Sequence, residues 1–61
     1  MPMVKIELFP GRTREQKARA AREITDAIQR TLGAPPEATD IIFVEVAKSD
    51  WASAGKLADE R

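Results

Sequence analysis

Two residues near the start of the chain, Pro2 and Arg12, could do chemistry. If Met1 is removed, Pro2 becomes the amino terminus, and its secondary amine is a titratable base held on the backbone. An α-amino group titrates near ~7.7–8, and an apolar setting lowers that pKa because burial disfavours the ammonium form. A neutral amine at pH 7 can take a proton from the carbon α to a carbonyl and return it to another carbon. Pro2 also has a purely structural interpretation, since proline suits the first position of a strand.

Arg12 follows Pro10 and Gly11, a pair that is typical of a turn. An arginine in such a turn is commonly a solvated surface charge, whereas a functional one would use its forked donors to bind a carboxylate or a phosphate. A strand between Pro2 and Arg12 would hold them roughly 25 Å apart at ~3.3 Å per residue. One chain cannot bring both residues to one small substrate, so a shared site requires antiparallel pairing of two subunits through this strand.

The elements that must position these residues begin with a strand over residues 3–9. "MVKIELF" alternates apolar and polar side chains, which is the pattern of a half-buried strand. Thr13 and Gln16 then form a capping-box pattern that predicts a helix over residues 14–32. An apolar stripe runs along this helix at helical spacing; its members are Ala21, Ile24, Ile28 and Leu32. Gly33 is placed to end the helix, and two prolines follow it.

A second strand is predicted over residues 41–47, "IIFVEVA", which is apolar almost throughout. A strand of this kind is normally buried on both faces by other parts of the protein, but a single helix can bury only one of them. The other face must meet something else, most simply a second copy of the sheet. Strand, helix and strand of these lengths predict a right-handed β-α-β unit with parallel strands. The segment 48–61 predicts a loop or a small hairpin before a polar end. The fold class expected is therefore α+β, assembled into an oligomer.

Size and composition support the same assembly. We expect the 61 residues to form one domain, 1–61, and a chain of this length buries only roughly 60% of its unfolded surface when it folds alone. Its large aliphatic side chains are few, and many other apolar positions are alanine. The chain has no cysteine and no histidine, which excludes disulfide staples and the common zinc-site patterns. Burial against other copies is the remaining remedy.

The charge balance excludes several kinds of partner. Ten basic and ten acidic residues cancel, so no net field attracts nucleic acid or an acidic membrane. The amino terminus lacks the apolar run of a signal peptide, and no stretch approaches the ~20 apolar residues of a membrane span. We therefore expect a soluble cytoplasmic protein that contacts neither nucleic acid nor membrane.

Four stretches of the chain together resemble the 4-oxalocrotonate tautomerase family, within the superfamily of amino-terminal proline tautomerases. They are Pro2 before a short strand, "GRTREQK" at the start of the helix, "LGAPPE", and "VEVAKSDW". The match runs without gaps along nearly the whole chain, so it is far more specific than any single motif. The resemblance implies a β-α-β subunit, commonly assembled as a hexamer of three dimers.

The resemblance also implies roles for individual residues. Pro2 matches the family's catalytic amino-terminal proline, which is exposed when the initiator methionine is removed. Arg12 matches the arginine that binds a substrate carboxylate in a neighbouring subunit's site. Trp51 falls where an aromatic residue lines the site, although packing within the hairpin is the alternative role. The family uses no cofactor and no metal, and its substrates are small carboxylic acids.

The chain departs from the family's pattern at position 40. A second arginine, which polarises the 2-oxo and carboxylate end of the substrate, should fall there, and this chain has Asp40. Asp40 is either a turn residue or a site residue that repels an anionic substrate and stabilises the Pro2 ammonium. In the hairpin, Ala52 and Ala54 stand where the family commonly has glycine.

Two functions of different classes therefore stay open. The first is a tautomerase that moves a proton on a small 2-oxo or 2-hydroxy-dienoate acid, with Pro2 as the general base, in a homo-hexamer. The second is a non-catalytic or half-competent subunit of a hetero-hexamer, in which a sister chain supplies the missing arginine.

Overall fold

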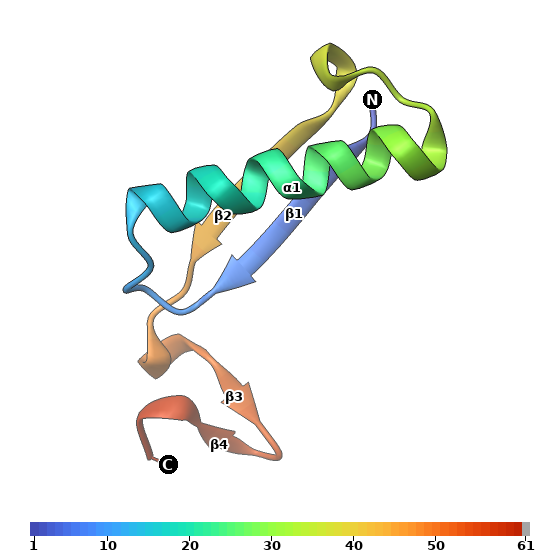
Figure 1. The fold of residues 1–61 in the computed structure, drawn as a ribbon. Helices are drawn as coiled ribbons and strands as arrows, with labels where there is room; N and C mark the ends of the chain where they lie inside the picture. The colour runs from blue at the N-terminus through green and yellow to red at the C-terminus, as the bar shows by residue number, and fades with distance from the viewer. Residues whose placement is uncertain (61) are drawn as a thin grey trace.

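Two parallel strands, β1 (Met3–Leu8) and β2 (Asp40–Glu45), lie side by side, and helix α1 (Arg14–Leu32) crosses one face of the pair (Figure 1). A short antiparallel hairpin, β3 (Ala52–Ser53) and β4 (Lys56–Leu57), extends from the far end of the sheet. This computed structural model describes residues 1–60; residue 61, the last of the expected domain, lies outside them. The predicted β-α-β unit with parallel strands and a carboxyl-terminal hairpin is confirmed.

Helix α1 begins and ends where the sequence predicts. The Thr13 hydroxyl accepts a hydrogen bond from the Gln16 backbone N–H at 3.1 Å, and the Gln16 side chain accepts one from the Thr13 N–H at 2.9 Å. This reciprocal pair satisfies two N–H groups that the first turn would leave without acceptors. At the other end, Gly33 has φ 73° and donates its N–H to the Gln29 carbonyl. Glycine adopts this left-handed conformation without steric cost.

Both strands are shorter at their carboxyl ends than predicted, and β2 begins one residue earlier. The Asp40 N–H donates to the Pro2 carbonyl at 3.0 Å, and this bond starts the ladder. The last rung is the bond from Val46 N–H to the Leu8 carbonyl at 2.8 Å. Pro10 has no N–H with which to extend the pairing, so both strands leave the sheet at this level.

The helix lies over the face of the sheet that carries Val4, Ile6 and Phe43, all of which are half-buried. Of the predicted helical stripe, Ile24 and Ile28 are half-buried on this side, as expected. Leu32 was expected in the stripe as well, but it is 70% exposed. The reason is length. Nineteen helical residues span ~28 Å, whereas six strand residues span ~20 Å, so the last turn of α1 extends past the sheet.

The opposite face of the sheet has no helix over it. Met3 is 46% exposed and Ile42 is 44% exposed on this face, beside Lys5 and Glu7 of β1. Among the described residues, Ala58 alone is buried. The chain exposes 4713 Å², against roughly 3,950 Å² for a compact protein of its mass. Its radius of gyration is 14.5 Å, against roughly 10.5 Å for a compact domain of this length. The isolated chain therefore lacks a closed core.

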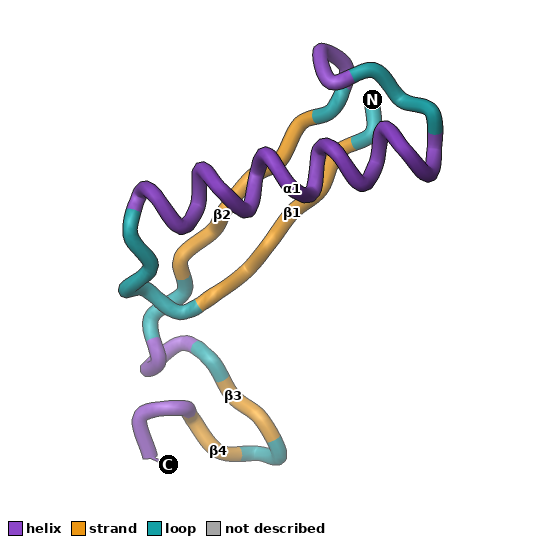
Figure 2. The backbone as a smooth tube through the Cα atoms, viewed as in Figure 1, coloured by secondary structure: helices purple, strands orange, loops and turns teal. Residues whose placement is uncertain are grey.

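A short loop joins β3 to β4 (Figure 2). It turns at Ala54 and Gly55, where φ is 53° and 79°. Positive φ at both central residues is the geometry of a type I′ turn, in which glycine or asparagine is favoured. The chain keeps this geometry although alanine occupies the first position. Ala58 N–H donates to the Trp51 carbonyl at 2.7 Å, which joins the far end of the hairpin to the segment that follows β2. No helix in residues 1–60 combines the length and apolarity that crossing a membrane requires.

Candidate active site

Arg12 lies in the loop that joins β1 to α1, at the carboxyl end of the sheet. The loop leaves the strand through Phe9 and Pro10, and Gly11 has φ 123°, a conformation that side chains disfavour. This turn places Arg12 beside the point where the chain leaves β2. The two segments come together because the strands are parallel, so both of their carboxyl ends lie at the same edge of the sheet.

A hollow of about 390 Å³ lies at this edge, and Arg12 and Trp51 both line it, with Lys48. The rest of its wall is formed by Leu8, Phe9 and Pro10. The Phe9 and Trp51 rings are 4.6 Å apart between centroids, with their planes at 57°. This arrangement is a stable tilted aromatic pair. The structure thus brings together two of the residues that the sequence singled out, Arg12 and Trp51, on an apolar and aromatic wall.

The charge of this hollow is positive. Arg12 and Lys48 line it, and none of its lining residues is a carboxylate. Lys17 lies nearby on α1, but its Nζ pairs with the Glu45 carboxylate at 2.7 Å across the gap from helix to sheet. Within residues 1–60, neither Arg12 nor Lys48 forms an ion pair. An anion such as a carboxylate would find two available cations here.

Pro2 and Asp40 lie at the opposite end of the sheet. Met3 and Asp40 are paired in the register, and the Asp40 N–H donates to the Pro2 carbonyl. Pro2 is half-buried and Asp40 is exposed. Asp40 is the first residue of β2, so the predicted start of this strand at residue 41 is wrong by one residue. The length of β1 separates this end from Arg12, as the sequence predicts. With Met1 present, the Pro2 nitrogen is part of a peptide bond.

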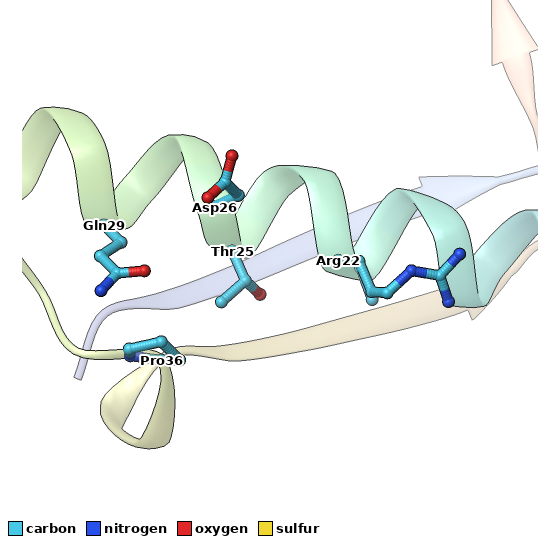
Figure 3. A pocket seen from close by; sticks show the side chains of 6 residues that line it. Arg22, Thr25, Asp26, Gln29 and Pro36 are labelled. Carbon is cyan, nitrogen blue, oxygen red and sulfur yellow. The ribbon is translucent and has the colours of Figure 1, made fainter.

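A second hollow, of about 400 Å³, lies between α1 and Pro36 (Figure 3). Thr25 and Gln29 point from the helix toward Pro36, while Asp26 points away from it and Arg22 extends along the helix. None of the residues predicted for the site lines this hollow. Within residues 1–60, no side-chain hydrogen bond joins two of its lining residues.

The shifts in pKa that the structure does produce lie on the exposed surface of α1. The Arg19 guanidinium donates a hydrogen bond to the Glu23 carboxylate at 2.7 Å, which lowers the pKa of Glu23 and raises that of Arg19. This pair supports the helix and is remote from both ends of the sheet. Across residues 1–60, no group of three or more histidine, cysteine, aspartate or glutamate side chains is placed to hold a metal ion.

Lys48 is the residue that reasoning from the sequence missed. It begins the short 3-10 turn Lys48–Asp50, directly after β2. The signal was available in the predicted topology. The ends of two parallel strands meet at one edge, so a basic residue soon after each strand places two cations together. Arg12 follows β1 and Lys48 follows β2 in this way.

Comparison with known proteins agrees with the fold. Residues 2–61 match the Tautomerase family, described as tautomerase enzyme. A probable tautomerase of Ralstonia nicotianae is 40% identical over 60 residues, covering 98% of this chain and 92% of that protein. The 2-hydroxymuconate tautomerase of Pseudomonas putida is 38% identical over 60 residues, covering 98% of this chain and 95% of that enzyme.

Solved structures give the same result. YwhB, a homologue of 4-oxalocrotonate tautomerase, superposes with a TM-score of 0.94 at 33% identity, covering 98% of each chain. A heterohexamer 4-oxalocrotonate tautomerase from Chloroflexus aurantiacus superposes with a TM-score of 0.90 at 30% identity, covering 98% of this chain and 97% of that one. From the full-length match and the shared β-α-β fold, we conclude that this chain belongs to the tautomerase family.

Proposed function

We propose that this chain, once Met1 is removed, catalyses proton transfer on a small 2-oxo or 2-hydroxy-dienoate acid, with the Pro2 amine as general base. The observation that carries the proposal is the division of groups between the two ends of the sheet. Pro2 stands at the start of β1, and Arg12 lies with Trp51 in one hollow at its far end. Membership of the tautomerase family supports the same reaction.

Each residue has a role that follows from its chemistry. The neutral Pro2 amine takes a proton from the carbon α to the carbonyl of a 2-oxo acid, or from the hydroxyl of a 2-hydroxy-dienoate, and returns it to a different carbon. Arg12 binds the substrate carboxylate through charge-assisted hydrogen bonds. Trp51, packed on Phe9, supplies an apolar wall that excludes water and so favours the neutral form of the amine.

The site requires more than one subunit. Pro2 and Arg12 are separated by the length of β1, and the uncovered face of the sheet exposes Met3 and Ile42. We propose that antiparallel pairing of subunits brings the Pro2 end of one chain beside the Arg12 end of another, within a homo-hexamer. This assembly closes the core that the isolated chain lacks.

Asp40 favours a second candidate, a half-competent subunit of a hetero-hexamer. The Asp40 backbone N–H is bonded to the Pro2 carbonyl, so an acidic residue stands at this end of the sheet, where a neighbouring subunit's arginine would be needed to complete the site. The Chloroflexus aurantiacus relative is itself a heterohexamer. In this case the chain alone would assemble without turning over substrate.

The test is the purified homo-oligomer, with removal of Met1 verified by intact mass, assayed on phenylpyruvate enol and on 2-hydroxymuconate. We expect saturable turnover of at least one of them. An oligomer that has lost Met1 and converts neither substrate would refute the homo-oligomeric enzyme and favour the half-competent subunit. Restored turnover on addition of a sister chain would then establish that alternative.

A further inference from the structure

Two features position Lys48 at the hollow that Arg12 lines: the hydrogen-bonded turn that carries it and the contact of its ammonium group with Phe9. Its turn is closed by two backbone bonds, from Asp50 N–H to the Ala47 carbonyl at 2.8 Å and from Trp51 N–H to the Lys48 carbonyl at 3.3 Å. Its Nζ lies 5.6 Å from the centre of the Phe9 ring, within the range of a cation–π contact. Phe9 in turn packs against Trp51. The ammonium group is therefore positioned on the aromatic wall of the hollow.

Lys48 forms no ion pair within residues 1–60, whereas several other cations of the chain do. Lys17 pairs with Glu45, and Arg19 and Arg30 pair with acidic residues of α1. Among residues 1–60, no carboxylate lines the hollow that Lys48 shares with Arg12. Two like charges placed together repel each other, and an anion bound between them removes that repulsion.

We propose that Lys48 is a specificity-determining residue that binds, together with Arg12, a single substrate carboxylate. The inference rests on the function proposed above and extends it to the class of substrate. The planar Arg12 guanidinium suits the two oxygens of a carboxylate, and the Lys48 ammonium adds a point charge to the same group. The remainder of the substrate lies against Leu8, Phe9 and Trp51, which are apolar.

The amino end of the sheet limits how many carboxylates the substrate can carry. Asp40 lies beside Pro2, so a second carboxylate near the base would face a negative charge. Both cations stand at the other end, where one hollow of about 390 Å³ holds them. The chain therefore selects an acid with one carboxylate, bound at the Arg12 end, and an uncharged group toward Pro2.

Binding can be measured without turnover, because Trp51 is the only tryptophan and the chain has no tyrosine. The verified Met1-free oligomer is titrated with 3-phenylpropionate and with 3-phenylpropionamide, its uncharged counterpart, while Trp51 fluorescence is followed. Lys48→Gln should weaken binding of the acid by about two- to five-fold, the range of an exposed ion pair. It should leave the affinity for the amide unchanged, and Lys48→Arg should restore the affinity for the acid.

Lys56→Gln is the matched control. Lys56 is also an exposed lysine, but it lies in β4 and does not line the hollow. This variant should bind both ligands as the wild type does. An equal loss of acid and amide in Lys48→Gln, or unchanged binding of the acid, would overturn the proposal.

A second pair of ligands tests whether both cations hold the same carboxylate. With fumarate and its monomethyl ester, Lys48→Gln should weaken both to a similar extent. If it weakened only the diacid, Lys48 would be holding a different carboxylate from Arg12, and the proposal would be wrong. Steady-state assays on phenylpyruvate enol separate this inference from the proposed function. Lys48→Gln should raise KM and spare kcat, whereas a wild type without turnover would refute the function and leave the titrations to decide the role of Lys48.

Discussion

The two ends of the β1–β2 sheet differ in their charged residues and in the chemistry that those residues can perform. At the carboxyl end, Arg12 and Lys48 share a hollow walled by the Phe9–Trp51 pair. At the amino end, the half-buried Pro2 is joined through its carbonyl to Asp40. One end brings two cations together, and in the proposed function the other offers a base once Met1 is removed. Neither end is a complete site.

This division indicates how a chain of 61 residues could build an active site without a core of its own. A 2-oxo acid also has two unlike ends, an anionic carboxylate and a carbon that loses a proton. Antiparallel pairing of two chains would align these unlike ends, since it sets the amino end of one strand against the carboxyl end of the other. Packing of the uncovered sheet face against a further copy in the same assembly would cover exposed apolar side chains such as Ile42.

The largest effect should come from blocking the amino end. A variant that retains Met1, or that carries a tag before Pro2, should lose turnover and keep its fold, because an amide nitrogen is not a base. Pro2→Ala should keep only weak activity, since a primary amine remains in a different geometry. Intact mass and circular dichroism must accompany the assay. Full turnover by a sample verified to retain Met1 would show that Pro2 is not the base.

Mixing two impaired variants tests whether the two ends meet between chains. A chain that retains Met1 still has Arg12, and Arg12→Ala with Met1 removed still has Pro2. If each site takes one end from each chain, oligomers that are dissociated and reassembled together should regain part of the wild-type rate. Each variant reassembled alone is the control. No recovery, with mixed oligomers confirmed by native mass spectrometry, would place both groups in one chain.

Folding of the chain should also depend on association with other subunits. We expect a hexamer built from dimers and no stable folded monomer, because the sheet face with Met3 and Ile42 has no cover in one chain. Light scattering and circular dichroism over a dilution series should show that association and folded structure are lost together. A folded monomer at micromolar concentration would contradict this prediction and remove the basis for a shared site.

The next largest effect should come from removing the Arg12 side chain. Arg12→Ala removes a charge-assisted hydrogen bond, which costs ~1.5–3 kcal/mol, or roughly 10- to 150-fold. The loss should raise KM, because the carboxylate is bound equally in the ground state and the transition state. An ester of the same substrate should be affected far less. If acid and ester suffered equally, Arg12 would be an ordinary surface charge.

The sequence predicted the local structure well, because short-range chemistry determines it. Thr13 with Gln16 defined the start of the helix, and Gly33 defined its end. Alternation along β1 gave the correct faces. Leu32 was assigned to the covered stripe wrongly, because periodicity reports the face of a helix and not the length of the sheet beneath it.

The candidate site was predicted only in part. Arg12 and Trp51 were expected at one site, and they line one hollow. Lys48 was not identified, because its significance depends on two turns that follow different strands, and no motif in the sequence joins them. The proposed meeting of Pro2 with this hollow requires a second subunit, which one chain does not contain.

The smallest effect should come from Asp40, and it tests the charge of the amino end. A carboxylate near the Pro2 ammonium stabilises the charged amine and raises its pKa. Asp40→Arg replaces this attraction by repulsion, so the pKa of the amine should fall. The rate rises with pH as the amine loses its proton, and this rise should therefore begin at lower pH in the variant. Because Asp40 is exposed, the attraction lost and the repulsion gained are each worth only ~0.2–1 kcal/mol, so together they should shift the profile by roughly 0.3–1.5 pH units.

The same substitution should also change the preference between substrates. Wild type should convert a monoacid such as phenylpyruvate enol better than the dicarboxylate 2-hydroxymuconate, because the second carboxylate meets Asp40. Asp40→Arg should improve the dicarboxylate and leave the monoacid nearly unchanged. Asp40→Asn, which removes the charge and keeps the shape, should fall between the two. The measurement is kcat/KM for both substrates across pH in all three proteins. If neither the rates nor the pH profile changed, Asp40 would point away from the site, and the contrast between the ends would rest on Arg12 and Lys48 alone.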